Sequence, residues 1–226
     1  MDQPDLDPGT HVQALCGLER INRWSGSAHI LWPSIRRLAG QAGATRLRLL
    51  DVATGAGDVP IHLARWARRA GIPLDIDACD RSPIALGHAQ RRASEQEVSV
   101  RFFEWDAFSG PLPAGYDIIT SSLFLHHLDH AQANSLLRRM VEAAGRMVLI
   151  NDLERSRLGL LFAQVGTRIL TSSPVVHADG PMSVAAAFTC KELLGLAEQA
   201  GLTGVTVQRR WPFRMLLSWT RKKAGP

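Results

Sequence analysis

Cysteine is scarce in this chain. Its 226 residues include only three cysteines, Cys16, Cys79 and Cys190, and no two of them form a C-x-x-C pair. Disulfide frameworks need several paired cysteines, and structural zinc sites usually contain closely spaced ones. We therefore expect free thiols and no bound metal ion.

Long apolar runs are also missing. No stretch approaches the roughly 20 apolar residues that a membrane-spanning helix needs. The first residues, MDQPDLDPGTH, lack the basic and apolar regions of a secretory signal peptide. These observations predict a cytoplasmic protein without a membrane span. The length and the 46% hydrophobic content suit one α/β domain with a substantial core.

Lysine is rare as well. Only three of the 26 lysine and arginine residues are lysines. The arginines are spread along the expected helices, so the net charge of +5 favours solvated helix faces over a nucleic-acid surface. We expect a small-molecule partner and no nucleic acid. Nothing in the sequence indicates an oligomeric state.

The most informative stretch covers residues 47–71. It begins with a nearly continuous apolar run, which is typical of a parallel strand buried on both faces. The glycine-rich segment DVATGAGD follows, and then a helix with Asp58 as its expected N-cap and Gly71 as its end. Glycines let the backbone approach a ligand, and a helix N-terminus presents unpaired N–H groups to it. We therefore predict a ligand-binding strand, turn and helix.

Asp51 narrows the choice of ligand, because its carboxylate precedes the glycines and would repel a pyrophosphate but attract a cation. S-adenosylmethionine (SAM) has a sulfonium and an α-amino group. The segment DVATGAGD resembles the first motif of class I SAM-dependent methyltransferases, D-x-G-x-G-x-G, with Ala53 at the first glycine. Quinone-biosynthesis C-methyltransferases have a similar alanine. The resemblance implies that SAM is the cofactor and that it is bound here by Asp51, Ala53, Thr54, Gly55, Gly57 and Asp58.

A second expected strand, residues 74–80, ends in the carboxylate of Asp80. Doubly wound sheets commonly bind ribose hydroxyls at this position, so Asp80 is the predicted ribose ligand. Asp75 and Asp77 alternate with apolar residues and are interpreted as solvent-facing. The segment from Asp80 through Arg81 to Pro83 resembles the D-x-S-x segment of the same family, which adds Arg81 to the expected cofactor site.

Two more strand ends contribute to the expected cofactor site. After the strand at residues 98–103, the resemblance implies that Asp106 receives the adenine amino group, with Ala107 beside it. A surface turn is the alternative for Asp106. The strand at residues 116–123 adds Ser121 and leads into the segment Phe-Leu-His-His-Leu. It lacks the Asn/Asp-Pro-Pro-aromatic motif of nucleic-acid and protein-amide methyltransferases and resembles small-molecule enzymes instead.

Three residues are candidates for catalysis, His127, His126 and Asp152. They follow the expected strands at residues 116–123 and 146–150. Methyl transfer to a phenol or enol needs a base, and the ordinary histidine pKa of roughly 6.5 suits that task. His127 is slightly favoured over His126, and Asp152 is a candidate substrate ligand or orienting partner. Either histidine could instead cap a helix or lie in the core, and positioning without a base also stays open.

The remaining segments are expected to surround the sheet. Residues 1–10 are predicted to be disordered, and residues 11–44 are predicted to form two short helices broken at Ser25-Gly26. These helices either pack on the sheet edge or form a lid over a pocket. Residues 153–188 are the expected substrate-side insertion, with a loop over residues 171–188. The predicted substrate-binding residues are Trp24, Trp32, His126, Asn151 and Asp152.

Together these observations predict an α/β fold over residues 45–226. The expected sheet is Rossmann-like, doubly wound, seven-stranded and mostly parallel, with an antiparallel last strand and an N-terminal helical cap. The favoured function is O-methylation of a small hydroxylated aromatic or polyketide-like acceptor. The alternatives are C-methylation of a quinone-type ring, an NAD-dependent oxidoreductase and a SAM-binding protein without catalysis.

Overall fold

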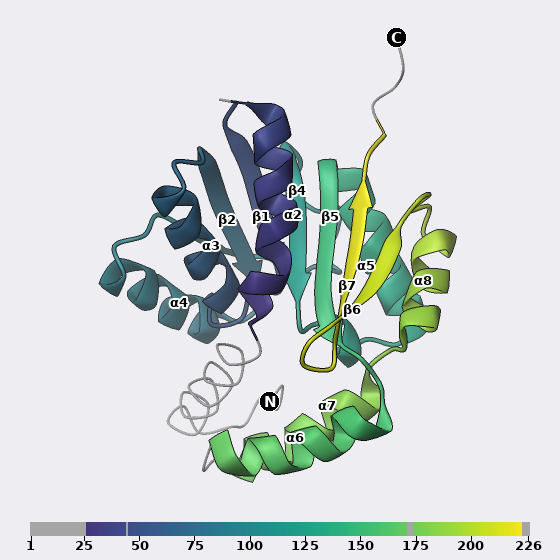
Figure 1. Ribbon diagram of the computed structural model, residues 1–226. Coiled ribbons are helices and arrows are strands. Elements are labelled where there is room, and N and C mark those ends of the chain that lie inside the picture. The colour runs from purple at the N-terminus through teal and green to yellow at the C-terminus, as the bar shows by residue number, and fades with distance from the viewer. Residues whose placement is uncertain (1–25, 44, 171–173, 223–226) are drawn as a thin grey trace.

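The computed structural model describes residues 26–43, 45–170 and 174–222. One seven-stranded sheet runs through the molecule in the order β3-β2-β1-β4-β5-β7-β6 (Figure 1). Strands β1 to β5 are parallel, whereas β7 runs antiparallel to both of its neighbours, as predicted. The strands are β1 (Leu47–Val52), β2 (Leu74–Asp80), β3 (Arg101–Glu104), β4 (Tyr116–Ser122), β5 (Ala144–Leu153), β6 (Thr206–Arg210) and β7 (Arg214–Thr220).

Helices cover both faces of this sheet. One face has α2 (Ser27–Ala42), α3 (Asp58–Arg69) and α4 (Pro83–Glu95), and the other has α5 (His130–Ala143) and α8 (Cys190–Gln199). Two separate apolar clusters form the core, one on each face, because the central strands are apolar on both sides. The described part of the chain contains no helix that is both long and apolar enough to cross a membrane.

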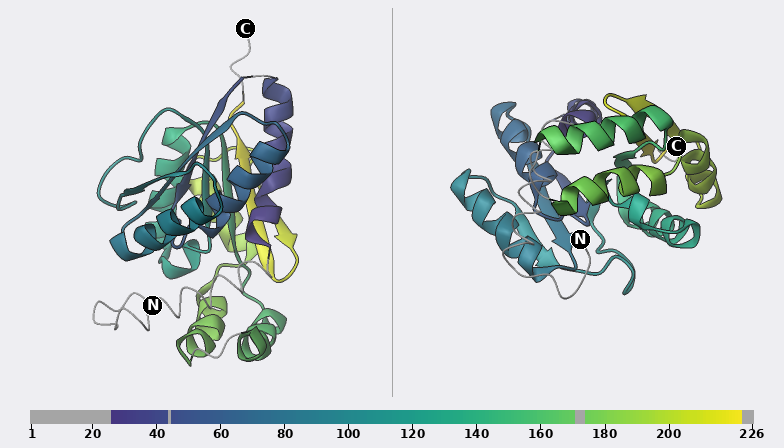
Figure 2. Two further views of the ribbon diagram at one scale, coloured as in Figure 1. Left: turned by 90° about the vertical axis from the view of Figure 1, so that its left-hand side faces the viewer. Right: turned by 90° about the horizontal axis from the view of Figure 1, so that it is seen from below.

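Two helices lie beyond the carboxyl ends of the parallel strands. Figures 1 and 2 show α6 (Arg157–Leu170) and α7 (Pro174–Ala186) side by side below the sheet. The loop predicted for residues 171–188 is therefore wrong over most of its length. Pro174 occupies the first helical turn, where proline is tolerated. Val184, Ala187 and Phe188, at the end of this segment, are buried, so packing stabilises this part of the chain.

Helix α2 is the described part of the expected N-terminal cap. Gly26 precedes it in a left-handed conformation (φ 65°). The first of the two predicted helices, and with it the predicted break at Ser25-Gly26, lies outside the described residues. Leu31 and Ile35 are fully buried, and the ring of Trp32 lies 5.8 Å from that of Trp66 on α3. This helix therefore packs on one face of the sheet. Trp24 and the tail at residues 1–10 lie outside the described residues.

The prediction that Asp77 faces solvent is wrong. Asp75 is exposed and pairs with Arg46, but Asp77 is buried beneath Arg101 and accepts a 2.6 Å hydrogen bond from the Tyr116 hydroxyl. Burial alone would raise the pKa of Asp77, but the hydrogen bonds from Arg101 and Tyr116 outweigh it and lower the pKa. Simple alternation along a strand missed this residue because β2 is covered on both faces.

Candidate active site

The glycine-rich turn connects β1 to α3 in an unusual backbone conformation. Ala53, Gly55 and Gly57 all have positive φ, at 55°, 55° and 75°. A Cβ atom on Gly57 would lie 2.8 Å from the Cβ of Ala89, so only glycine allows the turn to pack against α4. A Cβ atom on Gly55 would meet no atom within 4 Å. Gly55 therefore faces open space that a ligand can fill.

Three hydrogen bonds hold this turn in place. The amide of Thr54 donates to the Cys79 carbonyl at 3.0 Å, and Arg92 donates to the Ala56 carbonyl at 3.0 Å. The third joins the amide of Gly55 to the carboxylate of Asp80 at 2.8 Å. The turn is therefore anchored to β2 and to α4.

Asp58 does not cap α3 as expected. Gly57 occupies the N-cap position, and the Asp58 carboxylate accepts a 2.5 Å hydrogen bond from buried Arg92. The side chain of Asp58 thus joins α3 to α4, and its backbone amide stays at the helix N-terminus. A sequence pattern that places an acid after a glycine does not distinguish a cap from an interhelical ion pair.

Asp51 is buried at the end of β1. Its two carboxylate oxygens accept hydrogen bonds from the hydroxyls of Thr54 (2.7 Å) and Thr120 (2.6 Å). Burial raises the pKa of Asp51 to about 6, although these two hydrogen bonds lower it in part. Thr120, on the neighbouring strand β4, was missed by sequence reasoning because it has no motif of its own.

Asp80 stands beside the glycine turn, where the sequence placed the ribose ligand. One carboxylate oxygen accepts from Gly55, and the other accepts from the amide of Ser82 at 2.9 Å. Arg81 is exposed at the start of the next turn. Asp80 therefore connects the carboxyl ends of β1 and β2 at one edge of the sheet.

The other predicted cofactor residues lie along the same edge. The Trp105 amide donates to the Asp80 carbonyl at 3.0 Å, which brings the end of β3 close to the end of β2. Asp106 is exposed and its carboxylate accepts from the Phe108 amide at 2.8 Å, an arrangement that also fits the surface-turn alternative. Ala107 is buried. On β4, the hydroxyl of Ser121 donates to a β1 carbonyl.

The structure pairs one of the two candidate histidines with the candidate aspartate. The Nδ1 atom of His126 lies 2.7 Å from a carboxylate oxygen of Asp152, and both side chains are buried. The Leu125 amide donates to the other oxygen at 2.7 Å. His126 belongs to η1 (Leu125–His127), a short helix after β4, and Asp152 lies near the end of β5. Two adjacent strand ends therefore form this pair.

The surroundings of Asp152 favour a charged carboxylate. Burial alone would raise its pKa, but the charge and hydrogen bond of His126, the Leu153 amide and the Arg214 charge together lower it. A carboxylate that accepts from Nδ1 leaves the Nε2 atom of His126 as the nitrogen that can take a proton. His127, by contrast, is exposed, and its ring centroid lies 4.1 Å from that of His126.

Asn151 is fully buried next to this pair, as a residue of β5. Within the described part of the chain, neither its side-chain nitrogen nor its side-chain oxygen has a hydrogen-bond partner, and the same holds for the hydroxyl of Ser122. Ser122 is the register partner of Asn151 on β4. Buried polar atoms are seldom left without a partner, so these atoms are available to a bound ligand. The sequence singled out Asn151 but missed Ser122.

Comparison with known proteins addresses the family directly. Residues 49–145 match the methyltransferase domain family. The crystal structure of the S-adenosylmethionine-dependent methyltransferase SibL has a TM-score of 0.61 and 25% identity, and the match covers 85% of this chain and 56% of that one. This chain contains a class I SAM-dependent methyltransferase domain. The predicted family and fold are thereby confirmed, and the match favours a methyltransferase over the NAD-dependent oxidoreductase alternative.

The names of the curated relatives include a C-methyltransferase and an O-methyltransferase. A demethylmenaquinone methyltransferase of Deinococcus radiodurans is 35% identical over 105 residues, which cover 46% of this chain and 42% of the relative. A 3-hydroxy-5-methyl-1-naphthoate 3-O-methyltransferase of Streptomyces sahachiroi is 29% identical over 134 residues, which cover 58% of this chain and 38% of the relative. The chain spans about half the length of the curated relatives it matches.

Proposed function

We propose that this methyltransferase transfers a methyl group from SAM to a hydroxyl oxygen of a small aromatic or polyketide-like acceptor. The observation that carries the proposal is the 2.7 Å contact between His126 and Asp152 at the carboxyl ends of β4 and β5. An aspartate that holds the Nδ1 proton fixes the ring and its tautomer, and Nε2 then acts as the base. We therefore prefer His126 to His127.

Residues along one edge of the sheet have separate roles in the proposed reaction. SAM supplies an electrophilic methyl group when it is bound. Gly55 leaves room for it, Asp80 offers its carboxylate to the ribose, and Asp51 provides negative charge near the cationic end. Asn151 and Ser122 offer hydrogen bonds to a polar group of the ligand or acceptor. His126 takes the acceptor's proton, so the oxygen attacks as an anion.

The atom that carries the transferred methyl group in the product tests this proposal. The full chain is incubated with SAM labelled with ¹³C in its methyl group and with a panel of naphthols, hydroxynaphthoates and demethylated naphthoquinols. The ¹³C chemical shift of the product distinguishes a methyl group on oxygen from one on carbon. A product methylated on oxygen is expected, and it should be lost in the His126→Asn variant. SAM binding without turnover of any member contradicts the proposal.

Methylation of a ring carbon is the second candidate function. The 28% identity over 130 residues to a ubiquinone/menaquinone biosynthesis C-methyltransferase of Azotobacter vinelandii favours it. A phenolate activates its ring carbons as well as its oxygen, so the same base serves both reactions. A carbon-bound ¹³C methyl group in the product would select this candidate. A binding protein without catalysis would give neither product.

Asp51 predicts how SAM affinity depends on pH. Its pKa of about 6 in the free protein means that a proton neutralises it at lower pH, whereas a cationic ligand favours the charged form. We expect the dissociation constant for SAM to rise by up to tenfold per unit as the pH falls from 6 to 4.5. Titration calorimetry at several pH values measures this effect. Asp51→Asn should flatten the pH profile, and an equally steep profile in that variant contradicts the assignment.

The same group has an opposite effect on the stability of the free protein. The folded pKa of Asp51 lies above its ordinary value of 3.8, so the folded state binds this proton more tightly than the unfolded state. The stabilisation is complete below pH 3.8 and is lost as the pH rises through 6. Ligand binding and folding therefore respond to this one proton with opposite signs.

Asp80 and Asp75 form a matched pair for the ribose assignment, because both lie on β2. Asp80→Ala should weaken SAM binding by more than about 1 kcal/mol, since a hydrogen bond to a charged acceptor contributes roughly 1.5–3 kcal/mol. Asp75 is exposed and bonded to Arg46, so Asp75→Ala should leave SAM affinity unchanged. Calorimetry on both variants makes the comparison. Equal affinities in the two variants would remove Asp80 from the site.

A further inference from the structure

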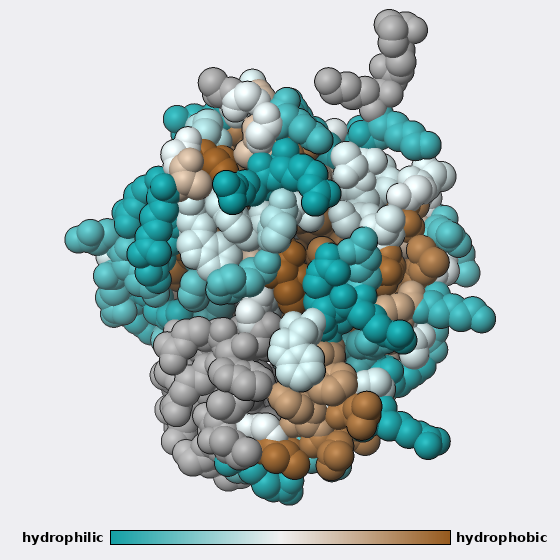
Figure 3. All heavy atoms as spheres, in the orientation of Figure 1, coloured by the Kyte–Doolittle hydropathy of each residue, from teal (hydrophilic) through white to brown (hydrophobic). Residues whose placement is uncertain are grey.

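Exposed apolar side chains gather at one end of the molecule. The described residues include six large hydrophobic side chains that are exposed, and five of them lie on α6, α7 or the turn between β6 and β7. Trp211 is 74% exposed and Leu158 is 68% exposed. Figure 3 shows apolar surface over the lower front of the molecule, where these elements lie. This surface, called the tip patch below, consists of Leu158, Leu161, Val165, Met182 and Trp211.

The tip patch has a regular construction. Leu158, Leu161 and Val165 are spaced three and four residues apart, so they lie on one face of α6, and that face points away from the protein. Phe162 of the same helix lies 6.1 Å from the ring of Trp211 and 5.4 Å from that of Phe213. The β6–β7 turn is thereby attached to α6, and the two elements present one continuous apolar surface.

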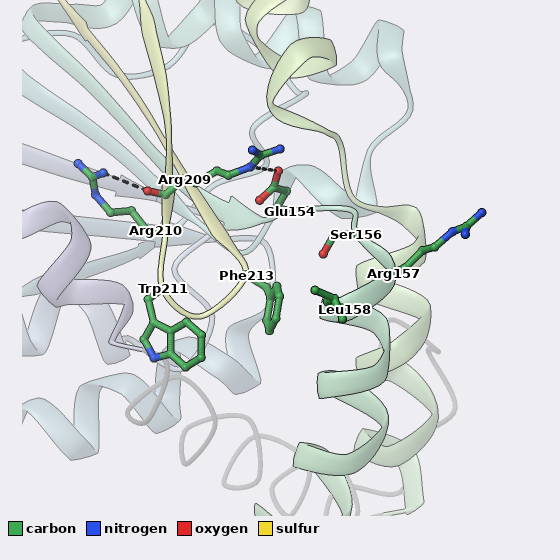
Figure 4. Close-up of a pocket in the computed structure, with 8 residues that line it drawn as sticks. All are labelled: Glu154, Ser156, Arg157, Leu158, Arg209, Arg210, Trp211 and Phe213. Carbon is green, nitrogen blue, oxygen red and sulfur yellow. Dashed lines mark hydrogen bonds and ion pairs between the residues drawn. The ribbon is translucent and has the colours of Figure 1, made fainter.

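Arginines flank the tip patch on α6 and on residues 206–213, whereas α7, which contributes Met182, contains Asp179 and no arginine. Helix α6 and residues 206–213 together contain four arginines, Arg157, Arg168, Arg209 and Arg210, and no acidic residue. Arg209 pairs with Glu154, but the other three form no ion pair with a described residue. Figure 4 shows Arg209 and Arg210 above Trp211, and Arg157 extending from the start of α6. A groove of about 530 Å³ lies between the start of α6 and the β6–β7 turn, and its lining includes Arg157, Leu158, Arg209, Arg210 and Trp211 as well as the acidic Glu154.

We propose that the tip patch docks this protein onto the surface of an anionic lipid bilayer. Tryptophan and leucine insert shallowly at the boundary between headgroups and acyl chains, and nearby arginines bind the lipid phosphates. The charge and the apolar area are thus complementary to such a surface. Helices α6 and α7 also project beyond the carboxyl ends of the parallel strands (Figures 1 and 2), so a flat membrane can reach them. The proposal concerns peripheral binding, and it is independent of which atom is methylated.

Vesicle binding by the full chain tests the proposal. The chain is sedimented with vesicles of phosphatidylcholine alone and with vesicles of equal parts phosphatidylcholine and phosphatidylglycerol. We expect strong partitioning onto the anionic vesicles and much weaker partitioning onto the neutral ones. Leu158→Ser combined with Leu161→Ser should reduce partitioning at least tenfold. Arg157→Glu combined with Arg210→Glu should abolish the preference for anionic lipid.

The sixth exposed hydrophobic residue provides a matched control. Ile84 is 51% exposed on α4, a helix that contributes no residue to the tip patch, and Arg91 is an exposed arginine on the same helix. Ile84→Ser combined with Arg91→Glu should bind vesicles like the unaltered chain. Thermal unfolding shows that each variant is folded, and Trp211→Ser, a single change in a turn, replaces the leucine pair if that pair fails to fold.

Three results would overturn the proposal. The first is no binding of the unaltered chain to anionic vesicles, and the second is equal binding by the patch and control variants. The third concerns self-association, measured by sedimentation equilibrium without lipid. If the unaltered chain dimerises and only the patch variants are monomeric, the tip patch is an interface between two copies.

Discussion

Replacing His126 by asparagine is expected to lower kcat by about 10²–10⁴-fold with little change in SAM affinity, the range for lost acid–base catalysis. Asparagine retains a donor near Asp152 but has no basic nitrogen. His126 is buried against Asp152 and makes its contact through Nδ1, so the loss concerns the free Nε2 atom. Steady-state rates at saturating SAM, with affinity from calorimetry, measure the two quantities separately.

His127 supplies the control for this experiment. It is adjacent in sequence but exposed, so His127→Asn should retain most of the activity and the same acidic limb in its pH profile. Asp152→Asn should lower activity too, but it also disturbs the hydrogen bonds from the Leu125 and Leu153 amides and should reduce stability. If His126→Asn keeps both its rate and the acidic limb, the enzyme works by positioning alone or uses another base.

Gly57→Ala is expected to destabilise the fold by at least about 2 kcal/mol. The new methyl group would lie 2.8 Å from the Cβ of Ala89 and 3.1 Å from the ring of Phe102. The left-handed backbone at φ 75° adds strain of about 1–2 kcal/mol, and overpacking adds about 1–3 kcal/mol. Denaturant unfolding with and without SAM measures the change.

Gly55→Ala is the matched comparison in the same turn. It shares the left-handed conformation, but its methyl group meets no atom within 4 Å, so it should cost only the backbone strain. Because the methyl group occupies the open space beside the turn, SAM affinity should fall at least tenfold. Normal affinity in the Gly55 variant would show that the ligand does not approach here. Equal stability of the two variants would contradict the packing assigned to Gly57.

The sheet was predictable because its central strands leave a strong signal. A parallel strand that is buried on both faces reads as a nearly continuous apolar run. Strands β1 and β5 show one, whereas β4 has only the pair Ile118 and Ile119 between polar residues. The positions of the residues at the strand ends were predictable for a related reason, because the carboxyl ends of parallel strands meet at one edge of the sheet. Asp51, Asp80 and Asp152 all lie at that edge.

The features that the sequence did not predict depend on contacts between segments that are distant in the sequence. No local pattern distinguishes His126 from His127, because the choice depends on which ring meets Asp152 from β5, 26 residues away. Asp77 is buried by Arg101 and Tyr116, which follow in the sequence. Helix α7 was expected to be a loop because prolines and polar residues mark its sequence. The buried residues at the end of this segment stabilise a helix that the local helix propensity disfavours.

The position of β7 has a consequence for biosynthesis. β7 lies between β5 and β6, although it follows both in the sequence. On the ribosome, β5 therefore keeps an unpaired edge until residues 214–220 have emerged, and Asp152 gains Met215 as its neighbour only then. An open strand edge invites pairing with other nascent chains. Translation that pauses before residue 214 should thus expose an aggregation-prone intermediate, whereas the glycine turn, which depends on earlier segments, can already be in place.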